Sequence, residues 1–335
     1  MKHLLFSLAF FASVTLFAQS AHETAYSFMK TGDNDNAILV LNKALQTSPN
    51  DEQLLQDITL AYYYKKDFAQ AQNYAKKLVD LDNVDVTSYQ IAGTVYRALE
   101  ETKEADKLYK KALKKYPNSG ALYSEYGELL WGKKDDEGAI DQWEKGIQAD
   151  PSYAGNYYHA SSYYFDTKDK VWSLIYGEIF VNMEYLTERA REIKEQLLKA
   201  YKEKLFLNAN AGEGKPTSPF AQAVYDTYAK QAGITGKGVT VETLTMIRTR
   251  FVLDWYAKYA AKFPFRLFDY QQQLLRSGMF EAYNQWLFGP IENLAAFDQW
   301  TRTNADVYKK FTSFQRGRVF KMPVGQFYGM VKKST

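Results

Sequence analysis

The stretch VTSYQIAGTVYRALEETKEADKLYKKALKKYPNS, residues 86–119, decides the fold of this chain. Small and aromatic residues recur in it at the three- and four-residue spacing of a helix face: Gly93, Tyr96, Ala105, Tyr109 and Ala112. Small residues let two helices approach closely, and the large residues fill the space beside them. Pro117 ends the second segment because proline has no amide hydrogen to continue a helix. The stretch therefore predicts a hairpin of two helices.

A 34-residue period extends this pattern over the first half of the chain. Units that start at 18, 52, 86, 120 and 154 bring a small residue to the same position without insertion or deletion: Ala37, Ala71, Ala105, Ala139 and Ser173. Equal spacing of this kind is typical of stacked structural repeats. We therefore predict five units over residues 21–185. The last is degenerate, because Ser173 and Gly177 replace the expected alanine and aromatic residue.

The pattern resembles the tetratricopeptide repeat (TPR) family, with its small, aromatic, alanine and proline positions in a 34-residue unit. The resemblance implies a superhelix whose first helices line a concave groove, and it implies that extended or helical peptides bind there. The family's groove positions, carried over one by one, are Tyr26, Met29, Gln56, Tyr63, Gln90, Thr94, Arg97, Glu128, Trp131, Tyr158 and Phe165.

Five of these groove residues share one position of the repeat and form a stripe of large side chains: Met29, Tyr63, Arg97, Trp131 and Phe165. In one interpretation the aromatic residues of the stripe contact a peptide, while Arg97, Gln56 and Gln90 bind its backbone or carboxylate groups. In the other, the stripe packs against the aromatic-rich C-terminal half of the same chain. The carboxylate-clamp subgroup of the family uses Lys and Asn here, so its chaperone-tail partners are not implied.

The rest of the chain is also predicted to be helical. Residues 186–207 resemble the amphipathic helix that closes such arrays, a polar loop follows at 208–219, and residues 220–335 form a helical C-terminal domain. Within this domain, residues 264–289 look like a decayed TPR hairpin, a last helix runs from Pro290 to Phe314, and residues 319–330 form an extended tail or a short edge strand. The fold class is therefore all-α, a helical-hairpin solenoid followed by a helical domain.

The first 20 residues, MKHLLFSLAFFASVTLFAQS, have the organisation of a secretory signal peptide. The apolar run from Leu4 to Phe17 is shorter than the roughly 18 to 20 residues that span a bilayer. Ala18 and Ser20 are small residues, so the signal can be cleaved after either of them. The chain has no cysteine, so no acylated cysteine follows the signal. We predict a periplasmic or secreted protein.

Charge is distributed unevenly along the chain. Residues 301–335 contain eight Lys or Arg and a single acid, Asp306, although the net charge of the whole chain is only +3. A basic end can contact an anionic surface, but charge at this density is also typical of a solvated surface. Nucleic acid is not expected as a partner, because the signal directs export and the repeat half is slightly acidic.

The sequence contains no catalytic or metal-binding motif. His22 and His159 are far apart and lie in neither an HxxxH nor an HExxH arrangement, and no GxSxG or phosphate-binding loop occurs. We assign the acids Glu178, Glu184, Glu188 and Glu192 to solvated helix faces. No cofactor, no metal and no enzymatic activity are therefore predicted.

The sequence thus predicts a protein- or peptide-binding scaffold or assembly module of the bacterial cell envelope that binds its partner in the TPR groove. The alternative is a glycan-handling or hydrolytic protein with its site in the C-terminal helical domain. An aromatic content of 16% allows that alternative, because sugar rings stack on Tyr and Trp faces, but repeat packing already uses many of these aromatic residues.

Overall fold

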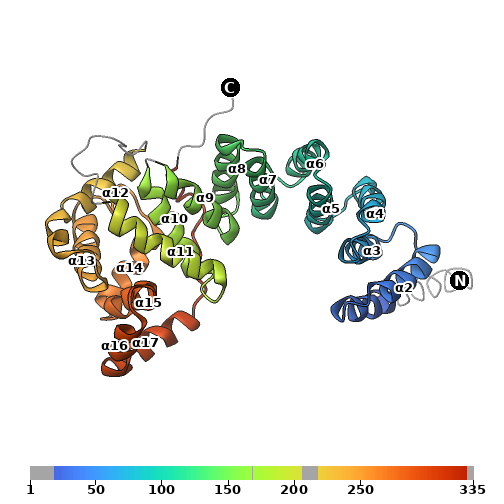
Figure 1. The fold of residues 1–335 in the computed structure, drawn as a ribbon. Coiled ribbons are helices and arrows are strands. Elements are labelled where there is room, and N and C mark those ends of the chain that lie inside the picture. Colours follow the sequence, from blue (N-terminus) through green and yellow to red (C-terminus); the bar gives the residue numbers. More distant parts are fainter. Residues whose placement is uncertain (1–18, 168, 206–217, 330–335) are drawn as a thin grey trace, which may run out of the picture. The chain divides into compact units, whose positions relative to one another are not determined.

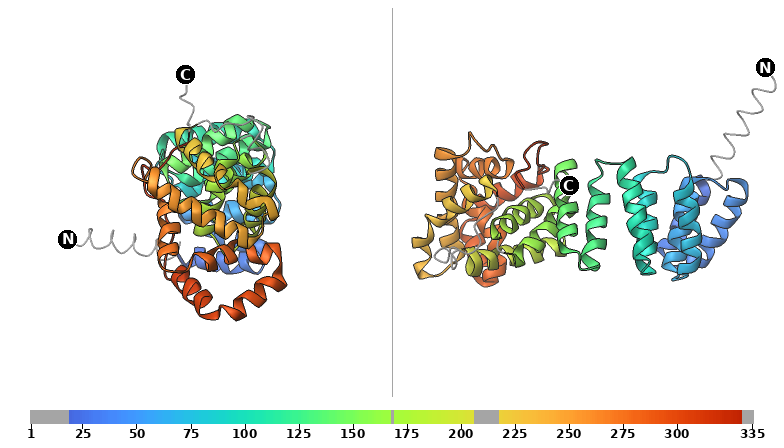
Figure 2. Two further views of the ribbon diagram at one scale, coloured as in Figure 1. Left: turned by 90° about the vertical axis from the view of Figure 1, so that its left-hand side faces the viewer. Right: turned by 90° about the horizontal axis from the view of Figure 1, so that it is seen from above.

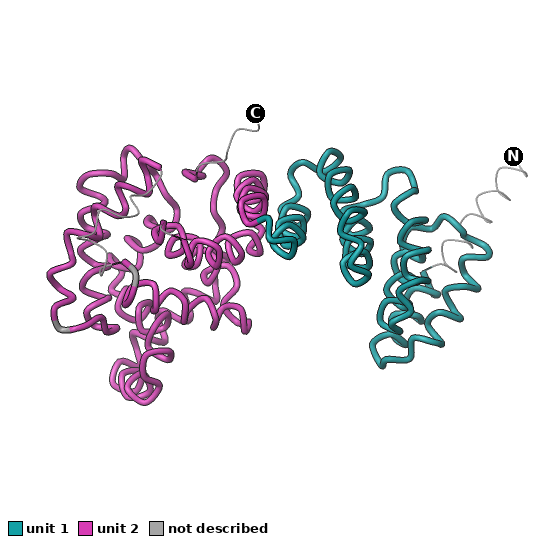
Figure 3. Tube along the Cα trace, turned by 45° about the horizontal axis from the view of Figure 1, so that its top comes forward, with its two compact units in different colours: residues 1–135 teal, residues 136–335 magenta. Residues whose placement is uncertain are grey.

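A computed structural model describes residues 19–167, 169–205 and 218–329 of the chain. Residues 1–18 of the predicted signal peptide, nearly all of the predicted loop at 208–219 and the end of the basic tail lie outside the described residues. Within them the chain is helical and has no strand, which confirms the all-α prediction. The chain divides into two compact units, Met1–Asp135 and Asp136–Thr335 (Figure 3). Each unit is described by itself below.

Unit 1 is a row of helical hairpins (Figure 1). A helix at residues 19–30 is followed by α2 (Asn34–Thr47), α3 (Glu52–Tyr64), α4 (Phe68–Asp80), α5 (Val86–Ala98), α6 (Thr102–Lys115) and α7 (Gly120–Gly132). Each helix packs against the next, and α5 also packs against α3 and α7. The blue-to-teal helices stand side by side in the right-hand view of Figure 2. The first helices of successive repeats are therefore direct neighbours.

The period of the sequence is also present in the backbone. The turn between the two helices of each repeat contains one residue with positive φ, and these residues are 34 positions apart: Gly32, Lys66, Glu100 and Lys134. Their φ angles are 81°, 65°, 57° and 64°. In three of the four turns a non-glycine residue adopts this left-handed conformation, which is uncommon for residues with a Cβ. The repeated turn thus follows from the hairpin geometry rather than from glycine.

Aspartate side chains cap four successive helices of unit 1, α2 to α5. The carboxylates of Asp33, Asp51, Asp67 and Asp85 each accept a hydrogen bond from the backbone N–H three residues further on. Such a cap satisfies one of the amide groups that the first turn of a helix leaves without a partner, and it is worth about 1 kcal/mol. The starts of these helices are therefore encoded locally.

The hairpin of α5 and α6 depends on a very small residue. A Cβ at Gly93 would lie 2.2 Å from Oη and 2.6 Å from Cζ of Tyr109. The Tyr109 ring is fully buried, and its hydroxyl donates a hydrogen bond to Oε2 of Glu125 at 2.9 Å. The ring therefore cannot move away without losing this bond.

We predict that Gly93→Ala lowers the free energy of unfolding by about 1 to 3 kcal/mol, the usual cost of overpacking a core. Gly132→Ala is the matched control, because a Cβ there meets nothing within 4 Å. The control is expected to leave stability unchanged or to raise it by up to about 1 kcal/mol. Urea unfolding followed by circular dichroism measures both, and equal stability of the two variants would contradict the packing described here.

Unit 2 begins with three helices of repeat-like length and continues into a helical domain (Figure 1). Its helices are α8 (Asp136–Ala149), α9 (Ala154–Asp166), α10 (Lys170–Met183), α11 (Glu188–Lys199), α12 (Pro219–Ala229), α13 (Val241–Lys258), α14 (Arg266–Arg276), α15 (Phe280–Glu292), α16 (Leu294–Thr303) and α17 (Ala305–Arg316). A π-helix, η1 (Ala200–Leu205), continues α11, and a 3-10 helix, η2 (Ala232–Lys237), precedes α13. None of the helices in the described part of the chain has both the length and the hydropathy of a membrane span.

The centre of unit 2 is α10, in which every residue from Val171 to Asn182 is buried. Glu178 lies on this helix and is 3% exposed, so its assignment to a solvated face is wrong. It forms an ion pair with the fully buried Arg248 of α13, and it accepts hydrogen bonds from Gln271 of α14 at 2.7 Å and from Tyr283 of α15 at 2.8 Å. A buried carboxylate is tolerated only with such partners.

The end of the chain differs from the single last helix that the sequence predicts. Helix α15 continues through Pro290 to Glu292, and Asn293 then caps α16 by accepting a hydrogen bond from Ala296 N at 3.0 Å. Asn304 separates α16 from α17, and the two helices form a V in the left-hand view of Figure 2. Beyond α17, residues 318–329 are neither helix nor strand, as the extended-tail alternative predicts.

Candidate peptide-binding groove

A polar network joins α5 and α7 on the predicted groove face of unit 1. Gln90 Nε2 donates a hydrogen bond to Glu125 Oε1 at 2.6 Å, and Arg97 Nη1 donates to Glu128 Oε2 at 2.6 Å. The hydroxyl of Tyr109, from α6, donates to the other oxygen of Glu125. The structure thus brings three predicted groove residues, Gln90, Arg97 and Glu128, into neighbouring pairs.

Burial is the main electrostatic influence on this network. Desolvation raises the pKa of Glu125, although the hydrogen bonds from Gln90 and Tyr109 and the charge of Arg97 act in the opposite direction. The side chains of Arg97 and Glu128 keep 31% and 36% of their exposure. The outer pair is therefore open to solvent on one side, whereas the inner carboxylate is held in place by neutral donors.

Aromatic groove residues lie on the helices to either side of α5. Tyr63 of α3 is half-buried, and its ring contacts those of Tyr64 and Phe68 at centroid distances of 5.8 and 5.7 Å. Trp131 of α7 is 43% exposed, and Tyr26 of the first helix is 59% exposed. Large exposed aromatic side chains offer contact area at a low cost in conformational entropy.

Three other predicted groove residues are used mainly within unit 1. Gln56 is 6% exposed, and its Nε2 donates to Asp85 and Ser88, so it joins α3 to the start of α5. Met29 packs against the core of the first hairpin. The hydroxyl of Thr94 donates to the backbone oxygen of Gln90 at 2.9 Å. These three side chains therefore stabilise the packing and the helices of unit 1 itself.

The two predicted groove residues of unit 2 face α11. Tyr158 donates a hydrogen bond to Glu192 Oε2 at 3.0 Å, and the guanidinium of Arg189 lies 5.1 Å from its ring centroid. The ammonium group of Lys199 lies 5.8 Å from the ring centroid of Phe165. For this part of the stripe, packing against the chain's own following helix accounts for the side chains.

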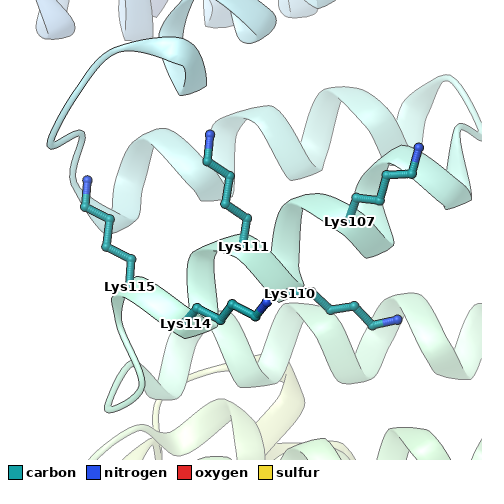
Figure 4. Close-up of a pocket in the computed structure, with 5 residues that line it drawn as sticks. All are labelled: Lys107, Lys110, Lys111, Lys114 and Lys115. Carbon is teal, nitrogen blue, oxygen red and sulfur yellow. The ribbon is translucent and has the colours of Figure 1, made fainter.

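A hollow of about 550 Å³ on α6 is lined by five lysines (Figure 4): Lys107, Lys110, Lys111, Lys114 and Lys115. Lys107 pairs with Glu104 at 2.9 Å and Lys110 with Asp106 at 2.8 Å. Lys111 and Lys115 donate to the backbone oxygens of Val79 and Val84. Four of the five ammonium groups therefore already have partners within unit 1, and none lies on the first helices that carry the groove residues.

Glu144 of α8 is a buried carboxyl group in unit 2. Burial raises its pKa to about 7, against the hydrogen bonds that Tyr164 and Tyr176 donate to its Oε1 at 2.9 and 3.1 Å. The C-terminal segment covers it, since a Cβ at Gly329 would lie 3.0 Å from the same oxygen. Among the described residues no group of three or more His, Asp or Glu is arranged to hold a metal ion.

The raised pKa of Glu144 predicts how the stability of unit 2 changes with pH. The folded state keeps a proton that the unfolded chain loses above pH 4.5, so stability falls between about pH 4.5 and 7 and then levels off. We expect the stability of Glu144→Gln not to fall in this pH range, because glutamine does not titrate and its amide oxygen still accepts both tyrosine hydroxyls. Above pH 7 the unchanged protein should have lost up to roughly 3 kcal/mol that the variant keeps.

Thermal unfolding of both proteins from pH 4 to 8 measures the difference between their profiles. Glu203→Gln, a change at an exposed acid of η1, serves as the control and should follow the unchanged protein. If the unchanged protein and Glu144→Gln lose the same stability as the pH rises, the buried carboxyl is not the titrating group.

The residues that sequence reasoning missed are acids inside otherwise buried helix faces. Glu125 stands between the buried Ser124 and Tyr126, and Glu178 stands in the apolar run of α10. An acid in a run such as VWSLIYGEIFV was a usable signal, because a carboxylate there must have a buried partner. Its partners lie too far along the chain for the sequence to name them.

These features define a helical-repeat protein with a polar and aromatic face on the first helices of its repeats. Two family models, both described as tetratricopeptide repeat, match residues 92–154 and 18–51. The chain therefore contains tetratricopeptide repeats.

The similarity to individual proteins covers only part of this chain. It is 29% identical over 116 residues to the anaphase-promoting complex subunit CDC16 of Saccharomyces cerevisiae, an alignment that covers 32% of this chain and 14% of that protein. A structure of MamA from Desulfovibrio magneticus RS-1 is 16% identical with a TM-score of 0.42, and covers 51% of this chain and 97% of that one. YrrB, described as a TPR protein with an unusual peptide-binding site, is 18% identical with a TM-score of 0.39, and covers 52% and 90%.

Proposed function

We propose that this protein is an exported scaffold of the bacterial cell envelope that binds an extended segment of a partner protein along the first helices of unit 1. The observation that carries the proposal is the ion pair of Arg97 on α5 with Glu128 on α7, beside aromatic side chains on α3 and α7, Tyr63 and Trp131. An extended peptide needs both kinds of contact, charged groups for its polar atoms and flat apolar area for its side chains.

The ion pair, whose side chains are about one third exposed, supports binding rather than stability. An exposed pair contributes only about 0 to 1 kcal/mol to folding, so it costs little to exchange one partner for a group of the ligand. Arg97 can then bind a carboxylate or backbone carbonyl of the peptide, while Glu128 accepts an amide or ammonium N–H. The inner network of Gln90, Glu125 and Tyr109 holds α5 and α7 in position for this exchange.

The groove is tested with random peptides displayed on phage and selected on the chain that starts at residue 21. For a selected peptide, Arg97→Gln is expected to weaken binding at least tenfold, since a hydrogen bond to a charged group contributes roughly 1.5 to 3 kcal/mol. Trp131→Ala is expected to weaken it similarly. Fluorescence polarisation of the labelled peptide measures both affinities.

Lys103→Gln is the matched control, because it removes one positive charge from an exposed position of α6. It should leave the affinity within about twofold, and circular dichroism should show the same helicity for all variants. If the selected peptides bind Arg97→Gln and Trp131→Ala as tightly as the unchanged chain, the groove is not their binding site.

Export is tested separately from binding. When the full chain is produced in a bacterium, we expect the mature protein to begin at Gln19 or Ala21, because Ala18 and Ser20 are the small residues that a signal peptidase accepts. N-terminal sequencing of the fractionated protein gives the answer, and Lys2→Glu is expected to reduce processing. An unprocessed chain in the cytoplasmic fraction would contradict the envelope location.

A further inference from the structure

A pocket of about 250 Å³ lies in unit 2 where α13 begins, α15 ends and α16 begins. Its lining includes Glu242 of α13, Gln285 and Glu292 of α15, and Phe297 and Trp300 of α16. The proposed peptide groove uses none of these residues. The pocket is therefore a separate feature of the C-terminal helical domain.

The amide of Gln285 is the polar group that distinguishes this pocket. Gln285 is 8% exposed, and within the described residues its side chain makes no hydrogen bond. Its polar atoms line the pocket, so a ligand can both donate to and accept from them, and each such hydrogen bond contributes about 0.5 to 1.5 kcal/mol. Gly289 leaves room for the Gln285 amide because it has no side chain: a Cβ there would lie 2.7 Å from Gln285 Oε1.

Two aromatic rings form one wall of the pocket. Phe297 and Trp300 lie three residues apart on α16, and the same missing Cβ of Gly289 would lie 2.6 Å from the Phe297 ring. Tyr308 of α17 contacts both rings edge-on, at centroid distances of 5.7 and 6.2 Å. The indole N–H of Trp300 donates to Glu281 Oε1 at 3.0 Å. The rings are therefore held in position before any ligand binds.

The rings of α16 pack against α15 and α17 and still keep part of their surface exposed. None of its residues is buried, and Leu294 is 61% exposed. A helix that packs only to fill a core normally buries an apolar stripe. Here the aromatic side chains remain half-buried at the edge of the pocket, where one face of a ligand can contact them.

The polar groups decide the charge of the ligand. Glu242 and Glu292 would repel an anion. An ammonium or guanidinium group has donors only, so it would leave the N–H groups of Gln285 without a partner. The charge of Glu292 is also already compensated, since its carboxylate pairs with Lys202 at 3.1 Å and accepts Val241 N at 2.9 Å. A neutral group that both donates and accepts fits the site.

We propose that this pocket binds a single neutral hydroxylated ring, a pyranose sugar unit, with the ring's C–H face on Phe297 and Trp300 and its hydroxyl groups on Gln285 and Glu242. A hydroxyl is both a donor and an acceptor, as the Gln285 amide requires. The volume lies below the roughly 300 to 1,000 Å³ of pockets for drug-sized ligands, which suits one ring rather than a chain enclosed along its length.

Saturation-transfer NMR on the chain that starts at residue 21 tests the proposal with glucose, galactose and N-acetylglucosamine as probes. We expect transfer to at least one sugar, with a Kd on the order of 1 mM. Gln285→Leu and Trp300→Ala should each weaken binding at least tenfold. Trp300→Ala is the safer variant, because it lies on a helix without buried residues and is expected to keep the fold.

Met246→Ala, a change at an exposed residue of α13 outside the pocket lining, is the control and should bind as the unchanged protein does. Three results would overturn the proposal. They are no transfer to any of the three sugars, equal transfer in Trp300→Ala, and transfer to Nα-acetyl-lysine amide in place of the sugars. Loss of peptide binding in Arg97→Gln has no bearing on this outcome, so the two sites are tested independently.

Discussion

The buried carboxylate of Glu178 determines how the C-terminal helices pack. It lies on a helix that is buried nearly all round, and its partners come from three different helices: Arg248 of α13, Gln271 of α14 and Tyr283 of α15. Removing one partner of such a pair typically costs about 3 to 5 kcal/mol, because the other charge remains buried. Helices α13 and α15 are thus fixed against α10. The pocket that Phe297 lines lies where α13 begins and α15 ends.

Packing and recognition share residues in unit 1. Gly93 allows Tyr109 to lie against α5, Tyr109 donates to Glu125, and Glu125 accepts from Gln90 on the groove face. A groove side chain is therefore connected to the hairpin core through two hydrogen bonds. This arrangement orders the polar groups before a ligand arrives, which lowers the entropy cost of binding. It also means that substitutions at Gln90 or Glu125 affect stability and binding together, whereas Arg97 and Trp131 lie further out.

The two proposed sites require different chemical features of a ligand. The groove offers a charged pair and separated aromatic residues along several helices, which suits an extended chain with polar backbone atoms. The pocket offers an unpaired amide and two adjacent rings in a small volume, which suits one compact neutral group. Glu144 has the raised pKa of a catalytic acid, but the C-terminal segment covers it, and its two tyrosine partners account for its position.

The sequence alone determined what repeats along the chain. The 34-residue period predicts the all-α class, the buried alanines and the neighbouring first helices, because in a repeat array each unit contacts mainly the next one. The resemblance to the TPR family implied that Gln90, Arg97 and Glu128 share one face. Only the tertiary structure decided what does not repeat: the partners of Glu178, the position of Tyr158 against α11 and the pocket around Gln285. Glu178 meets partners 70 and 105 residues away, and no local pattern specifies contacts of that separation.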